Sequence, residues 1–166
     1  MSTRNPLTEL FATFPRPRCY VASPLGFSEA GRDYHARFVQ ALVEHVEPVD
    51  PWTLSQPAEF AAAAAADRLH AFGIEVGARN AAAIYSAHML IAHLDGQEVD
   101  AGTAAEVGYA AALGLPCVGV RSDLRRSGEP GMRVNLQLET FIELSGGFIA
   151  GSLDELVARL AALRAA

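Results

Sequence analysis

The sequence has little cysteine, little basic charge and no long apolar run. Its two cysteines, Cys19 and Cys117, are too few for a disulfide framework and lack the spacing of a metal site. Acidic residues outnumber lysine and arginine by 19 to 13, and the net charge of −6 disfavours binding to a nucleic-acid polymer. No apolar run approaches the roughly 20 residues of a membrane span, and residues 1–14 lack a secretory signal core. We therefore expect a soluble, cytoplasmic protein that contacts neither nucleic-acid polymers nor membranes.

The sequence does contain enough apolar material for a folded core. Its 166 residues are 51% hydrophobic and 19% charged, with a mean hydropathy of +0.16, which argues against disorder. This length suits one domain. Three prolines within residues 1–17 predict an extended N-terminal lead-in, and we expect residues 18–166 to form the single domain.

Short apolar runs alternate with segments of helical periodicity along the chain. Strands are expected near residues 18–22, 46–49, 89–94, 116–120 and 148–150. Helices are expected near 29–45, 74–87, 103–113 and 134–144, after Ser152, and from Pro57 until Gly73 interrupts the pattern. Continuous rather than alternating hydrophobicity indicates strands that are buried on both faces. The alternation therefore predicts an α/β fold, with a doubly wound, flavodoxin- or Rossmann-like sheet of about five parallel strands flanked by helices.

Three polar segments follow predicted strands, where ligands bind in doubly wound folds. They cover residues 23–28, 95–103 and 122–135. The second segment, extended to residue 106, holds four carboxylates, those of Asp95, Glu98, Asp100 and Glu106. Gly102 lies among them and allows close approach of a ligand. This acidic segment is therefore the richest candidate site.

The residues alone leave the role of Glu106 open. A place in the first turn of a helix, beside the positive end of its dipole, would favour an ionised carboxylate suited to nucleophilic attack or charge stabilisation. The Thr103-Ala-Ala-Glu106 pattern is also that of a capping box, in which Glu106 bonds to the Thr103 amide. Asp100 can hold a substrate hydroxyl or move a proton, or it can serve, like Asp95, as a loop or N-cap residue.

Several segments form an ordered set that includes a D-x-G-T-x-x-E-x-G-x-A pattern. They are Tyr20–Glu29, Asp50–Trp52, Leu94–Gly96 and Asp100–Ala110, continued by 134–136 and 145–147. This set, which spans roughly residues 18–150, resembles the nucleoside 2-deoxyribosyltransferase family. The resemblance implies exchange of the base on a 2′-deoxyribonucleoside, with free purines or pyrimidines as the other substrates and with no metal or other cofactor.

The resemblance also implies roles for individual residues. Glu106 would attack the anomeric carbon and carry a covalent deoxyribosyl group, while Asp100 would contact the sugar hydroxyls and orient Glu106. Tyr20 would hydrogen-bond to Glu106, although a purely core-packing role is also open. The other residues expected to bind substrate are Ser23, Gly26, Phe27, Trp52, Asn80, Asp95, Gly102, Thr103 and Asn135.

Three of these residues have a structural alternative. Phe27 can stack on the base or anchor its loop, and Trp52 can wall the base or cover the core. Asn135 can cap a helix, or it can reach a sugar hydroxyl from a neighbouring subunit, as the resemblance implies. The second role predicts a homo-oligomer whose sites are completed by a neighbouring copy.

The sequence departs from the family pattern at two positions. Asn80 stands where some members carry an aspartate proposed to handle the proton of the base. An amide can hydrogen-bond to the base but cannot protonate it, which leaves Asp95 and Asp100 as candidate acids. His88 stands where an aspartate is usual, and it faces away from His93 on the same strand, so the two cannot share a metal. The remaining three histidines are expected on exposed helix surfaces.

Two rival functions use the same fold. A related hydrolase would act on 2′-deoxynucleoside 5′-monophosphates, using Glu106 but passing the sugar to water. Its phosphate could be held by Arg125, Arg126 or Arg133 of the late polar loop. A nucleotide-sensing module would instead bind its ligand without turnover. The preference between purines and pyrimidines stays open at this stage.

Overall fold

Five parallel strands form the central sheet of the computed structural model, which describes residues 5–125 and 127–165. The strands are β1 (Arg18–Ala22), β2 (Glu47–Val49), β3 (Met89–His93), β4 (Cys117–Val120) and β5 (Phe148–Ala150). Their order is β2-β1-β3-β4-β5, and Tyr20 of β1 lies opposite Val49 on one side and Leu90 on the other. This order is that of flavodoxin-like doubly wound folds, so the predicted fold class is confirmed.

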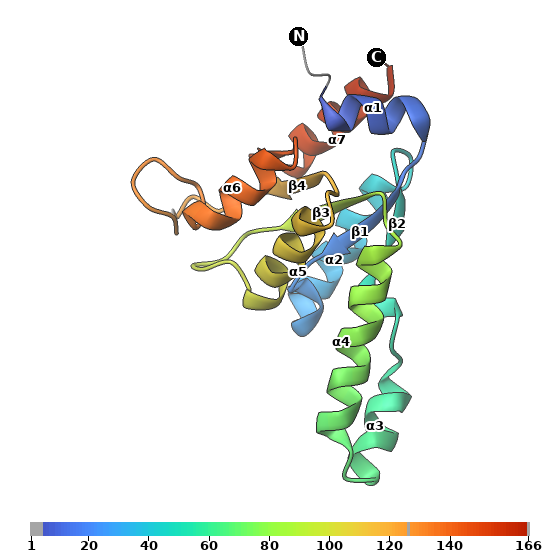
Figure 1. The fold of residues 1–166 in the computed structure, drawn as a ribbon. Helices are drawn as coiled ribbons and strands as arrows, with labels where there is room; N and C mark the ends of the chain where they lie inside the picture. Colours follow the sequence, from blue (N-terminus) through green and yellow to red (C-terminus); the bar gives the residue numbers. More distant parts are fainter. Residues whose placement is uncertain (1–4, 126, 166) are drawn as a thin grey trace.

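Helices cover both faces of the sheet (Figure 1). They are α1 (Pro6–Thr13), α2 (Glu29–Leu42), α3 (Pro57–Ala65), α4 (Leu69–Tyr85), α5 (Ala101–Ala112), α6 (Leu136–Leu144) and α7 (Leu153–Ala165). Buried residues of α1, α2 and α7 pack with Cys19 and Val21 of β1, whereas those of α4, α5 and α6 pack with Tyr20 and Ala22. Alternate residues of one strand therefore enter two separate cores, as the continuous apolar runs predict.

The N-terminal segment differs from the expected extended lead-in. Residues 6–13 form helix α1, while residues 1–4 lie outside the described part of the chain. Asn5 caps the helix by accepting a hydrogen bond from the Leu7 amide at 2.8 Å, and Pro6 occupies the first position, where its missing N–H costs nothing. Leu7 and Phe11 are buried in the same core as α7. The helix α1 is therefore part of the folded core rather than a tail.

The α3–α4 hairpin extends away from the sheet (Figure 1). Its turn lies at Asp67, whose φ of 53° is left-handed, and not at Gly73, which is inside α4. The predicted interruption at Gly73 is therefore wrong, because one glycine inside a helix costs only about 1 kcal/mol relative to alanine. The rings of Phe60 and Phe72 meet edge to face with centroids 4.8 Å apart and join the two helices. This hairpin brings residues of α3 and α4 to the carboxyl edge of the sheet.

Within the described residues, none of the helices is both long enough and apolar enough to cross a membrane.

Candidate active site

A cavity of about 280 Å³ opens at the carboxyl edge of the sheet, beside the neighbouring strands β1 and β3. The strand order reverses between these two strands, and doubly wound folds bind their ligands at such a point. The residues that line the cavity are Ser23, Phe27, Pro51, Trp52, Ser55, Phe60, Val76, Asn80, Asp100, Gly102, Thr103 and Glu106. Most of the residues expected to bind substrate are thus brought together from four separate parts of the chain.

Tyr20 and Glu106 are joined by a short hydrogen bond. The phenol of Tyr20 donates to Oε1 of Glu106 at 2.6 Å. Tyr20 is fully buried in the core on the side of α5, so its packing role and its contact with Glu106 hold together. Burial and the nearby charge of Glu106 raise the pKa of Tyr20 above its ordinary value, which keeps the phenol a donor.

The start of α5 leaves Glu106 free to face the cavity. Asp100 caps this helix, since its Oδ2 accepts hydrogen bonds from the Thr103 amide at 2.9 Å and the Thr103 hydroxyl at 3.2 Å. Of the two roles left open for Glu106, the capping box with Thr103 as the cap is therefore contradicted, whereas the N-cap role left open for Asp100 is present. Helix α5 begins at Ala101, which places Glu106 in the second turn rather than the first.

Burial dominates the ionisation of Glu106. It raises the pKa of Glu106 above the ordinary 4.5, the Tyr20 hydrogen bond opposes the change, and the charge of Asp100 adds to it. The expected lowering by the helix dipole is thus outweighed, because the dipole effect falls off within the first turn. A half-buried carboxylate that holds one strong hydrogen bond retains free lone pairs that face the cavity.

Aromatic residues form the part of the cavity wall nearest the sheet edge at β2. Phe27 follows β1 and Trp52 follows β2, and their rings meet edge to face with centroids 4.7 Å apart. The indole Nε1 of Trp52 donates to the Ser23 carbonyl at 3.0 Å. The carboxylates of Asp100 and Glu106 come from the opposite side, after β3. The cavity therefore has a carboxylate side and an aromatic side.

Asn80 reaches the cavity from α4. Its side-chain oxygen is buried and has no hydrogen-bond partner among the described residues. Buried amide oxygens are normally paired, so this atom is suited to accept a hydrogen bond from a ligand.

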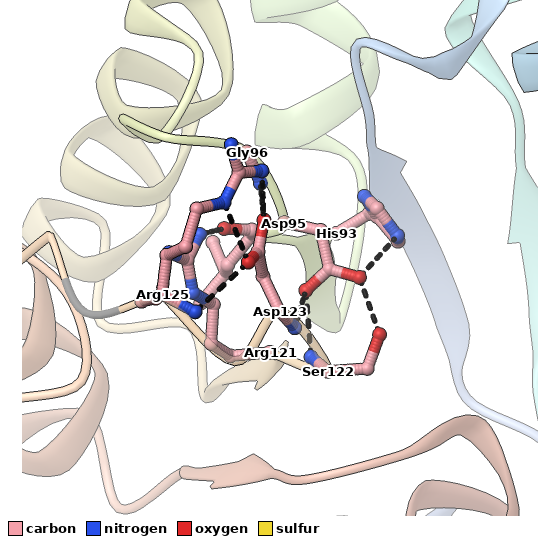
Figure 2. Close-up of polar contacts among 8 residues, drawn as sticks. His93, Asp95, Gly96, Arg121, Ser122, Asp123 and Arg125 are labelled. Atoms are coloured by element: carbon pink, nitrogen blue, oxygen red, sulfur yellow. Dashed lines mark hydrogen bonds and ion pairs between the residues drawn. The ribbon is translucent and has the colours of Figure 1, made fainter.

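Asp95 lies outside the cavity, in a network that fastens the loops after β3 and β4 (Figure 2). Its carboxylate accepts from the backbone amides of Ser122 at 2.6 Å and Asp123 at 2.9 Å, and also from the Ser122 hydroxyl. Partial burial alone would raise the pKa of Asp95, but hydrogen bonds from His93, Ser122 and the Asp123 amide outweigh it and hold this pKa well below its usual range. Asp95 therefore anchors these loops, and its carboxylate oxygens are engaged within this network.

The same network continues through charged side chains (Figure 2). Asp123 accepts from the Gly96 amide at 3.2 Å and pairs with Arg125 at 2.5 Å. The buried Arg121 donates to the carbonyl of Leu94 and, at 2.8 Å, to that of Arg125. These bonds fix the beginning of the loop whose far end carries Asp100.

Two further predicted residues lie outside the cavity. Gly26 is buried beneath the indole of Trp52, so that a side chain at this position would overlap the ring. Asn135 is exposed and caps α6 by accepting from the Gln137 amide at 3.0 Å. Within the chain itself, then, Asn135 has the helix-capping role.

Four lining residues were not predicted from the sequence. Pro51 directly precedes Trp52 and Ser55 lies three residues after it, so nearness in the chain to a predicted residue was the available signal. Phe60 and Val76 come from α3 and α4, which reach the cavity only through the fold of the hairpin. No local pattern marks either of them.

The histidines and cysteines do not form a metal site in the described ranges. Nowhere in residues 5–125 and 127–165 do three or more histidine, cysteine, aspartate or glutamate side chains gather as metal ligands would. His35 is buried, with Nε2 3.0 Å from the carboxylate of Asp50, so its expected place on an exposed helix surface is wrong. Cys19 and Cys117 are buried as predicted, and burial raises the pKa of Cys117 to about 12.

The chain is similar to one known family and to several solved structures. Residues 19–143 match the family described as nucleoside 2-deoxyribosyltransferase. No curated protein matches the chain. A conserved protein from Enterococcus faecalis V583 is 22% identical, with a TM-score of 0.62 over 89% of this chain and 98% of that one.

Two solved structures with described activities share the fold. A 2-deoxyribosyltransferase from the psychrotolerant bacterium Bacillus psychrosaccharolyticus is 19% identical, with a TM-score of 0.61 over 86% of this chain and 95% of that one. A CMP N-glycosidase from Clostridium botulinum is 15% identical, with a TM-score of 0.53 over 87% of this chain and 98% of that one. At these identities the solved structures establish only the architecture. The match over residues 19–143 also establishes the family of the chain.

Proposed function

The chain belongs to the nucleoside 2-deoxyribosyltransferase family, and we propose that it exchanges the base of a 2′-deoxyribonucleoside through a covalent intermediate on Glu106. The observation that carries this proposal is the 2.6 Å hydrogen bond from Tyr20 to Glu106 at the wall of a cavity that also contains Asp100. The bond orients one carboxylate oxygen and leaves the other for attack.

In the first step the free oxygen of Glu106 bonds to C1′ of the nucleoside. The C1′–N bond breaks, and its electron pair leaves with the base, which takes up a proton at that nitrogen. The product is an ester between Glu106 and deoxyribose, formed through a transition state with oxocarbenium character. The negative charges of Glu106 and Asp100 stabilise that positive character.

In the second step a nitrogen of the incoming base attacks C1′ and displaces the carboxylate of Glu106. The incoming base loses its N–H proton, so the proton taken up in the first step is returned in the second. This is the two-step carboxylate chemistry of retaining glycosidases, with a base in the place of water. Neither step requires a metal ion or another cofactor.

Asp100 is the residue that we assign to the sugar, in its ionised form, and the base exchanges its proton with solvent. Asp100 is the carboxylate besides Glu106 among the lining residues, whereas Asp95 is engaged in the loop network. We assign Asn80 to the base, because its unpaired side-chain oxygen can accept a hydrogen bond from an exocyclic amino group. Phe27 and Trp52 supply the apolar wall against which the base rings pack.

The lining of the cavity supports nucleosides over 5′-monophosphates. No arginine is among the lining residues in the described part of the chain. Arg125 is paired with Asp123, and Arg133 donates to the Ile149 carbonyl at 2.8 Å. Arg126 lies outside the described residues. A phosphate would therefore lack the charge-assisted hydrogen bonds that usually hold it.

We further propose that a neighbouring copy of the chain completes the site. Phe27 is 77% exposed although its ring forms part of the cavity wall, so this flank of the site is uncovered in the single chain. Asn135 is exposed and is not among the residues that line its own cavity, which suits a residue that serves the site of another copy. The proposed assembly is a homo-oligomer.

Base exchange is tested by incubating the protein with deoxyinosine or thymidine, with and without adenine or cytosine, and separating the products by chromatography. We expect a new nucleoside only when an acceptor base is present. Incubation with nucleoside alone should also yield protein whose mass is increased by one deoxyribosyl group, located on Glu106 by peptide mapping. Parallel incubations with the 5′-monophosphates separate the hydrolase, which would release deoxyribose 5-phosphate.

The matched pair of variants is Glu106→Gln and Glu143→Gln. Both remove one carboxylate charge at nearly constant shape, but Glu143 is exposed on α6 and outside the cavity. We expect Glu106→Gln to lower exchange at least about 1,000-fold, as loss of a nucleophile does, and Glu143→Gln to leave it intact. Ligand binding without any product, equally in wild type and Glu106→Gln, would replace the transferase by a sensing module.

A further inference from the structure

A second hollow adjoins the proposed catalytic cavity on the far side of Trp52. This groove of about 740 Å³ lies between α2 and the segment from Asp50 to Phe60. Helix α2 contributes Arg32, His35 and Ala36, with Val39 and Gln40 one turn further on, which is the spacing of a single helix face. Three residues, Trp52, Ser55 and Phe60, line both the groove and the catalytic cavity.

Trp52 is held in place from several directions. Its indole lies against Gly26, where even a methyl group would overlap the ring. Its Nε1 donates to the Ser23 carbonyl at 3.0 Å, and its backbone amide donates to the Asp50 carboxylate at 3.0 Å. The ring of Phe27 also meets the indole edge to face, with centroids 4.7 Å apart. These contacts hold the indole in the position where it borders both hollows.

The sizes of the two hollows differ in a way that bears on specificity. The catalytic cavity, at about 280 Å³, is at the lower limit of the roughly 300–1,000 Å³ that small-molecule sites occupy. A nucleoside with an unsubstituted base fills such a volume. The groove offers further space with apolar walls from Ala36, Val39 and Phe60, but the indole stands in between.

We propose that Trp52 sets the size of the base that this protein accepts, by closing the catalytic cavity off from the groove. The proposal rests on the proposed base exchange, and it assigns Trp52 to specificity rather than to the chemical step. A base with a bulky apolar exocyclic group is excluded as long as the indole is present. Removal of the indole joins the two hollows, and the groove then takes the substituent.

The test compares exchange onto adenine and N6-benzyladenine, and onto cytosine and N4-benzylcytosine, in wild type, Trp52→Ala and Trp52→Phe. The measured quantity is the ratio of kcat/KM for the plain base to kcat/KM for its benzyl derivative. We expect a ratio of at least about 100 in wild type, which is what a filled pocket achieves against extra bulk. Trp52→Ala should lower this ratio at least about tenfold, whereas Trp52→Phe, which keeps a ring in the gap, should retain most of it.

Val39→Ala is the matched control, because Val39 lines the groove but not the catalytic cavity. It enlarges the groove without opening the wall, so the ratio should not change. Calorimetric titration of the same bases gives the corresponding ratio of Kd values, and it is informative even if no variant exchanges bases. Absence of exchange in wild type would thus count against the transferase alone. An unchanged ratio in Trp52→Ala, or equal acceptance of plain and benzyl bases by wild type, would overturn the role of Trp52.

Discussion

At the scale of single residues, Glu106 is held between opposing influences on its charge. Burial and the nearby carboxylate of Asp100 raise its pKa, while the hydrogen bond from Tyr20 lowers it. The acidic limb of kcat/KM should therefore lie at higher pH than the ordinary glutamate pKa of 4.5 would place it, because the nucleophile must be ionised.

Two nearly isosteric changes should move this acidic limb in opposite directions. Tyr20→Phe removes the hydrogen bond that stabilises the carboxylate, so the limb should shift to higher pH, and kcat/KM should fall about 10–100-fold. Asp100→Asn removes a negative charge, so the limb should shift to lower pH. The pH profile of kcat/KM for both variants measures the position of the limb separately from its height. Shifts in the same direction would mean that another group controls the limb.

At the scale of elements, the first turn of α5 links the fold to the proposed chemistry. Asp100 both caps the helix and lines the cavity, so its structural and chemical roles must be separated. Asn is as good an N-cap as Asp, whereas Ala cannot accept the hydrogen bonds from Thr103. Asp100→Ala should therefore lower the free energy of unfolding by about 1 kcal/mol, and Asp100→Asn should leave it nearly unchanged. Urea unfolding midpoints measure both, and equal midpoints would contradict the capping role.

The same elements show what a sequence can predict and where prediction stops. The strands were predictable because buried strands such as Met89–His93 are continuous apolar runs. The three prolines of residues 1–17 predict an extended chain in place of α1, although Asn5 followed by Pro6 is also a helix start. The turn lies at Asp67 and not at Gly73, because aspartate is one of the few non-glycine residues that adopt a left-handed φ, whereas a single glycine does not end a helix.

The candidate site likewise contains residues that a local sequence pattern identifies and residues that only the fold brings together. Asp100, Gly102 and Glu106 lie within seven consecutive residues, so a local pattern could identify them together. Phe60 and Val76 enter the cavity only because the hairpin folds back, which is a long-range property. A capping role for Glu106 would require its side chain to accept from the Thr103 amide. That amide donates to Asp100 instead, which the residue pattern alone does not reveal.

At the scale of the whole molecule, the N-terminal helix should be needed for the stability of the fold. Leu7 and Phe11 are 2% and 4% exposed, in one core with α7. Leu7→Ala should cost about 2–5 kcal/mol of unfolding free energy and Phe11→Ala about 3–5 kcal/mol. The control is Glu9→Ala on the exposed side of the same helix, with an effect below about 0.5 kcal/mol. Small effects at all three positions would restore residues 1–17 to the status of a detachable lead-in.

The proposed assembly makes Asn135 the residue that one copy offers to the next. Serine is also a good N-cap, so Asn135→Ser keeps α6 capped while it shortens the reach of the side chain. If Asn135 serves a neighbouring site, Asn135→Ser and Glu106→Gln should each be impaired alone, yet co-expressed chains should form mixed oligomers with some intact sites. For random pairing in a dimer, roughly a quarter of the wild-type activity should return.

That recovery is specific to a shared site. Two residues that the same chain supplies to one site cannot complement each other when their defects are on separate chains of a mixed oligomer. Co-expression of Glu106→Gln with Asp100→Asn supplies the comparison, since both residues line the same cavity and their defects should not be rescued by mixing. Activity measured per chain, with the proportion of mixed oligomers determined from two affinity tags, decides between the outcomes. If Asn135→Ser mixtures recover no more activity than Asp100→Asn mixtures, Asn135 only caps α6, and each chain builds its site alone.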